Sequence, residues 1–183
     1  MNGIRELGTT SHHPELEKAP LLFFGHSAGA HFTVTFLSWR PDRVAGFAIV
    51  NGGHGRWSTS DAKAKMPGLW MLGEKDSEVV REGMTEGFSK GRRQGAPWAF
   101  AIQPGAGHEL GKARPLAIAF FDAIFQARRG SGAKPSAWTG DFRTHEIAPA
   151  LGGSPDGSLN AWLPDEPFAR KWRDFVTGAP AAP

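Results

Sequence analysis

The stretch LLFFGHSAGAHFTVTFLSW, residues 21–39, decides the fold. Residues 21–24 are apolar at every position, which is typical of a strand covered on both faces. The nearly all-apolar stretch from Ser27 to Trp39 predicts a buried helix. Between them, Gly25 and Gly29 flank Ser27 with little bulk, as a strained strand-to-helix turn requires. The sequence therefore predicts a strand, a sharp turn and a helix in direct succession.

Three more apolar runs, at residues 44–50, 69–72 and 98–102, have the character of strands. A helical pattern at Ser77–Arg93 separates the last two runs, and another at Ala113–Arg128 follows the last run. Strands that alternate with helices imply right-handed crossovers and a parallel sheet. The predicted fold class is α/β, with a mostly parallel sheet and helices on both faces.

The composition changes after Gly130. Residues 131–183 are rich in Gly, Pro and Ala and hold one convincing helix, Glu166–Val176. Three tryptophans in this stretch would be a poor choice for a free linker, so we expect it to wrap back onto the core. We divide the chain into a core at 1–130 and an extension at 131–183 with one short helix packed on that core.

Composition excludes several classes of protein. The chain has 183 residues, 40% of them hydrophobic, so it is too apolar for a disordered chain. With 21 basic and 18 acidic residues, mostly scattered, no nucleic acid is expected as a partner. The absence of Cys excludes disulfides, thiol nucleophiles and Cys-ligated metals. No signal peptide or membrane segment is predicted, and the compartment stays open.

The pattern Gly-x-Ser-x-Gly at 25–29 carries chemistry when a strand precedes it and a helix follows. Such a turn presents the Ser27 hydroxyl above the sheet edge as a nucleophile. The backbone N–H of Ala28, at the start of the helix, would then face a developing oxyanion. The alternative is a glycine-rich turn in which Ser27 is an ordinary helix-capping residue.

A serine nucleophile needs a base and an acid, and two later loops offer them. His108 follows the run at 98–102, and both Asp76 and Glu74 follow the run at 69–72. Both loops lie at the carboxyl ends of parallel strands, on the same edge as Ser27. The pattern favours His108 as the base and Asp76 as the acid, with Glu74 as the alternative acid.

Three other side chains are candidates for contact with a substrate. His26 lies beside Ser27, His54 follows the run at 44–50, and Trp57 comes shortly after it. No Asp or Glu cluster accompanies the histidines at metal-ligand spacing, so no metal is predicted.

Together these segments resemble the second half of an α/β-hydrolase. The amino-acid sequence of residues 19–29 and 104–108 is similar to that of bacterial esterases related to polyhydroxybutyrate depolymerase, feruloyl esterase and dienelactone hydrolase. The resemblance spans Leu16–Arg128. It implies a serine esterase that forms an acyl-enzyme on a small-molecule or polymeric ester, without a cofactor. Ser27 would be the nucleophile, Asp76 the acid and His108 the base, with the Ala28 N–H as one oxyanion donor.

The chain departs from that family at its amino end. Only about 20 residues precede Leu21, so strands one to four of the family's sheet and its second oxyanion donor have no counterpart. We expect the strand at 21–24 to present an open apolar edge that favours association with another chain, including a second copy. Either the chain is a piece of a longer hydrolase or another chain completes it. The alternative function is a hydrolase-derived interaction module with weak turnover.

Overall fold

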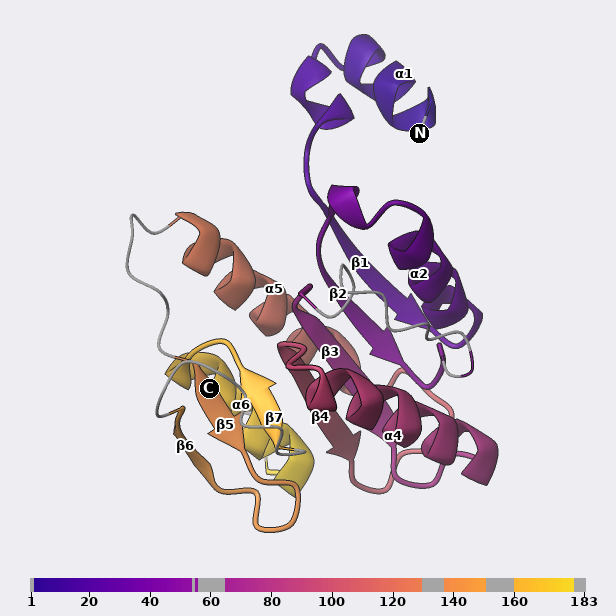
Figure 1. Ribbon diagram of the computed structural model, residues 1–183. Coiled ribbons are helices and arrows are strands. Elements are labelled where there is room, and N and C mark those ends of the chain that lie inside the picture. The colour runs from indigo at the N-terminus through magenta and orange to yellow at the C-terminus, as the bar shows by residue number, and fades with distance from the viewer. Residues whose placement is uncertain (1, 54, 56–64, 130–136, 151–159, 180–183) are drawn as a thin grey trace.

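The computed structural model describes residues 2–53, 55, 65–129, 137–150 and 160–179 (Figure 1). Its centre is a four-stranded parallel sheet in the order β1-β2-β3-β4. The strands are β1 (Leu21–His26), β2 (Val44–Val50), β3 (Gly68–Gly73) and β4 (Trp98–Gln103). The predicted α/β class with a parallel sheet is confirmed.

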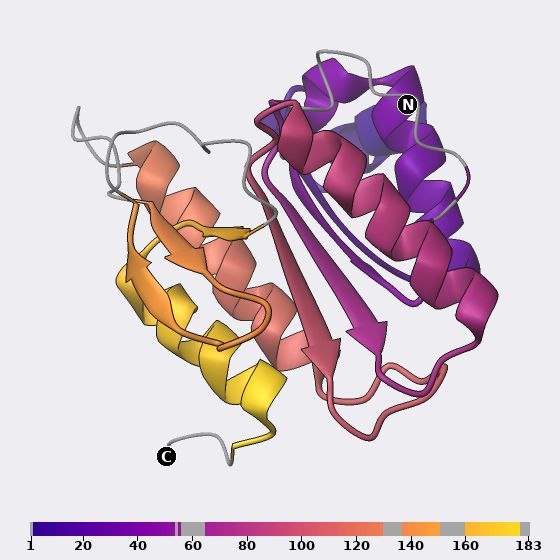
Figure 2. The ribbon, with the colours of Figure 1, turned by 60° about the horizontal axis from the view of Figure 1, so that its bottom comes forward.

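Helices cover both faces of the sheet. On one face lie α2 (Ala28–Trp39) and α4 (Glu78–Arg93), and on the other lie α5 (Ala113–Arg129) and α6 (Glu166–Thr177). Figure 2 shows the sheet between these two layers. Each predicted helix is present to within one residue at either end, because alternating strand and helix patterns leave little freedom in the boundaries.

Large aromatic side chains fill the layer between the sheet and α4. Trp70 and Trp98 are fully buried there beside Phe47, and the Trp98 indole Nε1 donates to the carbonyl oxygen of Met66 at 3.0 Å. Burial of each such ring removes about 150–250 Å² from water. Trp70 is therefore a core residue.

The extension forms a small antiparallel sheet that the sequence did not predict. It consists of β5 (Trp138–Gly140), β6 (Ile147–Pro149) and β7 (Ala161–Leu163), in the order β6-β5-β7. Strands of three residues are too short to show a period in a Gly- and Pro-rich sequence.

The described part of the extension packs against the main sheet through α6 and β7. Trp172 of α6 is fully buried, and its Nε1 donates to the carbonyl oxygen of Phe100 in β4 at 2.7 Å. Asp165 caps α6 by accepting from the Phe168 N–H at 2.8 Å. Both α6 and β7 therefore pack against β4, the strand at one end of the sheet order.

The opposite end of the sheet is less covered than the sequence predicted. Among the described residues β1 pairs with β2 alone. Phe24 is 38% exposed, and α5 packs mainly over the neighbouring strands β2 and β3. Phe32 of α2 is 61% exposed. The predictions of a strand covered on both faces and of a buried helix are thus wrong on the outer side, where no described element packs.

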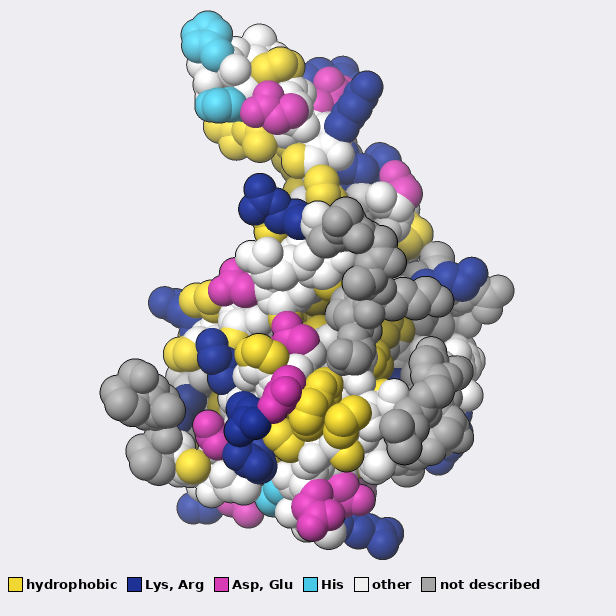
Figure 3. All heavy atoms as spheres, turned by 90° about the vertical axis from the view of Figure 1, so that its left-hand side faces the viewer, with side chains coloured by type: hydrophobic (Ala, Val, Ile, Leu, Met, Phe, Trp, Pro, Cys, Tyr) yellow, Lys and Arg dark blue, Asp and Glu magenta, His cyan; other side chains and the backbone are white. Residues whose placement is uncertain are grey.

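The amino-terminal segment forms a helix that the sequence did not predict. This helix, α1 (Asn2–Thr10), packs on a 3₁₀ turn, η1 (Pro14–Glu17), and Arg5 donates to Glu17 at 2.8 Å. A second 3₁₀ turn, η2 (Pro41–Arg43), joins α2 to β2. Figure 1 shows α1 standing clear of the sheet, and Figure 3 shows this end of the molecule as a lobe set apart from the rest. Across the described segments, no helix combines the length and apolar character needed to cross a bilayer.

Candidate active site

The turn between β1 and α2 holds Ser27 in a strained backbone conformation. Ser27 has φ of 53° and ψ of −115°, outside the regions that most residues adopt. Its N–H donates to the carbonyl oxygen of Val50 at 2.9 Å, which anchors the turn to β2. A backbone in this region costs about 1–3 kcal/mol and persists where its surroundings hold it in place.

Only one of the two flanking glycines is required by close packing. A Cβ on Gly25 would overlap the carbonyl group of Gly29 and lie 2.7 Å from the Thr33 hydroxyl oxygen. A Cβ on Gly29 would meet nothing within 4 Å. The predicted need for small residues is confirmed at Gly25 and is wrong at Gly29, since the helix start there faces open space.

Gly25→Ala is therefore expected to destabilise the protein by about 3 kcal/mol or more, because overlap with backbone atoms cannot be relieved by a side-chain rotation. Gly29→Ala is expected to leave stability unchanged or raise it by up to about 1 kcal/mol. Urea unfolding of both variants measures the difference. Equal destabilisation of the two would contradict the packing described for Gly25.

Three side chains from separate loops meet at the carboxyl edge of the sheet. His108 Nε2 lies 2.9 Å from Ser27 Oγ, and His108 Nδ1 lies 2.9 and 3.1 Å from the two carboxylate oxygens of Asp76. The Asp76 side chain is 2% exposed and that of His108 is 46% exposed. The three predicted residues are thus brought together, with the carboxylate buried and the imidazole open to solvent.

Asp76 and Glu74 have different partners. Asp76 contacts His108 and also accepts from the Ser77 N–H at 2.6 Å. Glu74 is turned to the other side of the loop, where its Oε2 accepts from the Gly105 N–H at 2.7 Å. The geometry thus pairs His108 with Asp76. Glu74 instead connects the loop that carries Asp76 to the loop that carries His108 through its hydrogen bond with Gly105.

The hydrogen-bond directions follow from the acceptor character of the carboxylate. An ionised Asp76 only accepts, so His108 Nδ1 carries the proton. A neutral His108 then has its lone pair on Nε2, which accepts from the Ser27 hydroxyl. This order of donors can move the serine proton onto the imidazole, and the buried carboxylate stabilises the cation that forms.

The remaining predicted residues are placed in part. Ala28 is the first residue of α2, where a backbone N–H has no acceptor within the helix. The His26 ring lies 5.4 Å from that of His108, centroid to centroid, and its Nε2 is buried without a hydrogen-bond partner in the described part of the chain. His54 and Trp57 lie outside the described residues.

Asn51 takes a place in the site that the sequence did not indicate. It follows β2, has a positive φ of 49°, and is 1% exposed. Its Nδ2 donates to the carbonyl oxygens of Gly107 (3.2 Å) and Glu109 (2.9 Å), which flank His108 in the chain. An Asn followed by two glycines after a strand was the available signal, since Asn tolerates positive φ better than most residues.

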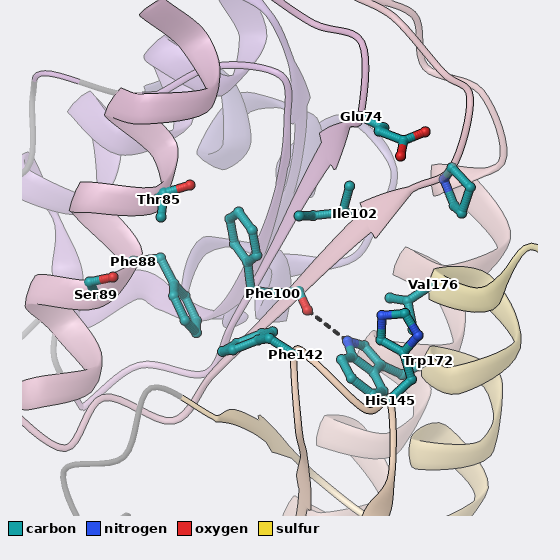
Figure 4. A pocket seen from close by; sticks show the side chains of 11 residues that line it. Glu74, Thr85, Phe88, Ser89, Phe100, Ile102, Phe142, His145, Trp172 and Val176 are labelled. Atoms are coloured by element: carbon teal, nitrogen blue, oxygen red, sulfur yellow. Dashed lines mark hydrogen bonds between the residues drawn. The ribbon is translucent and has the colours of Figure 1, made fainter. Parts of the chain in front are cut away.

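A cavity of about 390 Å³ is lined by residues of β4, α4 and α6. Phe88, Phe100 and Phe142 form its apolar floor, and Glu74 stands at its rim (Figure 4). Neither Ser27 nor His108 lines it. Within the described ranges no group of three or more His, Asp or Glu side chains could hold a metal ion.

No family model matches the chain, and no curated protein matches it. Two solved structures are similar to it in fold. One is SOBER1 of Arabidopsis thaliana, with 19% identity and a TM-score of 0.49, over 70% of this chain and 64% of that one. The other comes from a study of carboxylesterases of the thaumarchaeon Nitrososphaera gargenis, with 11% identity and a TM-score of 0.47, over 68% of this chain and 72% of that one. This chain thus spans less than two thirds of the length of SOBER1 and is similar to both structures in fold alone.

Proposed function

We propose that the chain is a serine hydrolase that cleaves carboxylic esters through an acyl-enzyme intermediate. The observation that carries the proposal is the continuous hydrogen-bonded series from Ser27 Oγ through His108 to the buried Asp76. A cap role for Ser27 is disfavoured, since its side chain makes no capping hydrogen bond to α2. Residues 1–130 would form the catalytic unit and 131–183 an extension that supports it.

In the first half-reaction, Ser27 Oγ attacks the ester carbonyl carbon and its proton passes to His108 Nε2. The tetrahedral intermediate collapses, the carbon–oxygen bond to the alcohol breaks, and the same proton moves to the leaving oxygen. Asp76 keeps the imidazole in the required tautomer throughout. In the second half-reaction a water molecule repeats the attack and releases the acid and free Ser27.

The oxyanion would be stabilised by the N–H of Ala28 at the start of α2. The described residues offer no second donor from a loop before β1, because that segment consists of α1 and η1 standing apart from the sheet. One donor of an oxyanion hole is worth about 10²–10³ in turnover, so the Ala28 N–H would contribute on that scale.

The substrate class is a small or polymeric carboxylic ester with ready access from solvent. The exposure of His108 supports an open site. His26 would contact the bound ester from beside Ser27, with His54 and Trp57 as further substrate contacts. The amino-acid sequence of residues 19–29 and 104–108 supports a relationship of this chain to the group of polyhydroxybutyrate depolymerase, feruloyl esterase and dienelactone hydrolase.

A fluorophosphonate tests the proposal directly. Attack by Ser27 Oγ forms an oxygen–phosphorus bond, breaks the phosphorus–fluorine bond and releases fluoride, which leaves a stable adduct. We expect mass spectrometry to find one adduct per chain on the peptide that contains Ser27. A chain that stays unmodified, or is modified at another serine, would overturn the proposal.

The exposed side of β1 favours a second candidate function, a hydrolase-like module that associates with a second copy of itself. Phe24 and Phe32 are exposed at this edge, and a strand edge leaves backbone N–H and C=O groups unpaired. Two identical edges can pair with each other about a two-fold axis.

Size-exclusion chromatography over a dilution series is expected to show a dimer that dissociates at low concentration. Phe24→Lys should elute as a monomer at every concentration, because lysine on an edge strand opposes pairing. Ile118→Lys is the matched control, since Ile118 is an exposed apolar residue of α5 away from this edge. A wild-type chain that is monomeric throughout would contradict the association.

A further inference from the structure

We propose that Asn51 is the positioning residue that fixes the distance between Ser27 and His108. The proposal rests on the serine hydrolase function above. Asn51 touches no reacting atom, and it would act through the three loops that meet around it.

The side chain of Asn51 ties two of these loops to each other. Its Oδ1 accepts from the N–H of Gly73 at 2.8 Å, at the start of the loop that leads to Asp76. Its Nδ2 donates to the carbonyl oxygens on either side of His108. Both ends of one buried amide are therefore used, and each end holds the backbone of a different loop, one leading to Asp76 and the other carrying His108.

The backbone next to Asn51 holds the third loop. The carbonyl oxygen of Val50 accepts from the Ser27 N–H at 2.9 Å. Gly52 lies directly under the turn, where an added Cβ would be 2.7 Å from the Ser27 carbonyl oxygen and 3.1 Å from its Cα. The end of β2 and the turn after it therefore lie between Ser27 and His108. The Val50 carbonyl holds the Ser27 backbone, and the Asn51 side chain holds the backbone on either side of His108.

The strained conformation of Asn51 points to the same role. A positive φ is unfavourable for a residue with a side chain, and glycine would adopt it without cost. A buried amide satisfied by three hydrogen bonds offsets that cost. Near-attack geometry is sensitive to displacements of about 1 Å, which cost on the order of 10² in rate.

The test compares Asn51→Gly and Asn51→Asp with the wild type. Gly keeps the backbone conformation and removes the amide. Asp keeps an acceptor for the Gly73 N–H but sets a carboxylate oxygen against the carbonyl oxygens that flank His108. The measured quantities are the fluorophosphonate rate constant, kcat and KM for p-nitrophenyl acetate, all per titrated active site and below the unfolding temperature of each variant.

Both variants are expected to lower kcat and the labelling rate constant by about 10²-fold, with KM within about two-fold of wild type. Trp172→Phe is the matched control, since it removes another buried side-chain to backbone hydrogen bond, the one to Phe100. That variant should lose stability and keep the wild-type rate per active site. Wild-type rates per active site in both Asn51 variants would overturn the proposal, and if Asn51→Gly does not fold, Asn51→Asp decides alone.

A proton NMR measurement separates this inference from the proposed function. The Nδ1–H of His108, hydrogen-bonded to Asp76, is expected to give a far-downfield resonance in the wild type. That resonance should shift or disappear in the Asn51 variants and persist in Trp172→Phe. An unreactive wild type would overturn the hydrolase function, whereas an unchanged resonance in the Asn51 variants would overturn the positioning role.

Discussion

Ser27→Ala is expected to lower kcat for p-nitrophenyl acetate by about 10⁴-fold, to a rate close to that of buffer. The change removes the oxygen proposed to attack the ester, and His108 then has no hydroxyl from which it could take a proton. Binding of the ester is left largely intact, so KM should change little where it can be measured. The assay follows release of p-nitrophenol over several hours at matched protein concentrations.

Ser38→Ala is the matched control for this change. Ser38 lies near the end of α2, the helix that Ser27 precedes, and its hydroxyl donates to the Val34 carbonyl oxygen at 3.0 Å. This variant should retain wild-type kcat. Equal rates above background in the wild type and Ser27→Ala would mean that the hydrolysis comes from another group or from a contaminant.

Asp76→Asn is expected to reduce kcat by about 10⁴-fold while leaving the fold intact. An amide at this position can donate to His108 Nδ1, which favours the tautomer with the proton on Nε2. That nitrogen then cannot accept from Ser27. Because Asp76 is buried, the amide also replaces the charge that would stabilise a protonated His108.

Glu74→Gln separates the two candidate acids. Glu74 contacts the Gly105 N–H and not the imidazole, so an amide oxygen can replace its carboxylate as the acceptor. Its kcat should fall by less than about ten-fold, as expected for the loss of charge in a single supporting hydrogen bond. The reverse order of effects would assign the acid role to Glu74.

The elements of the core could be predicted from the sequence because their patterns are local. The apolar runs at 44–50 and 69–72 are fully buried strands, as a sheet covered on both faces requires. Ser27, Asp76 and His108 could be located because they follow strands of one parallel sheet, whose ends meet at one edge. Asn51 also follows a strand of this sheet, but its contacts with the loops of Gly73 and His108 could not be predicted, since they depend on how those loops approach it.

Exposure at the end of the sheet could not be predicted either. Phe24 and Phe32 are residues of a type usually found in a core. They are exposed because no described element packs over this end of the sheet. The type of a residue indicates whether its side chain favours burial, but it does not indicate which elements will pack against that side chain. The same limit applies to β5, β6 and β7, whose pairing joins segments that have no pattern of their own.

The two ends of the main sheet are finished in different ways, and this limits the size of any assembly. At β4, the extension packs against the strand, and the Trp172 indole N–H donates a hydrogen bond to the Phe100 carbonyl oxygen. At β1, the described chain adds no further strand. A sheet open at both ends could add copies repeatedly and grow into a filament. A sheet with one end covered can join a second copy only once, so the proposed association through β1 would stop at a pair, and the extension at β4 would prevent further growth.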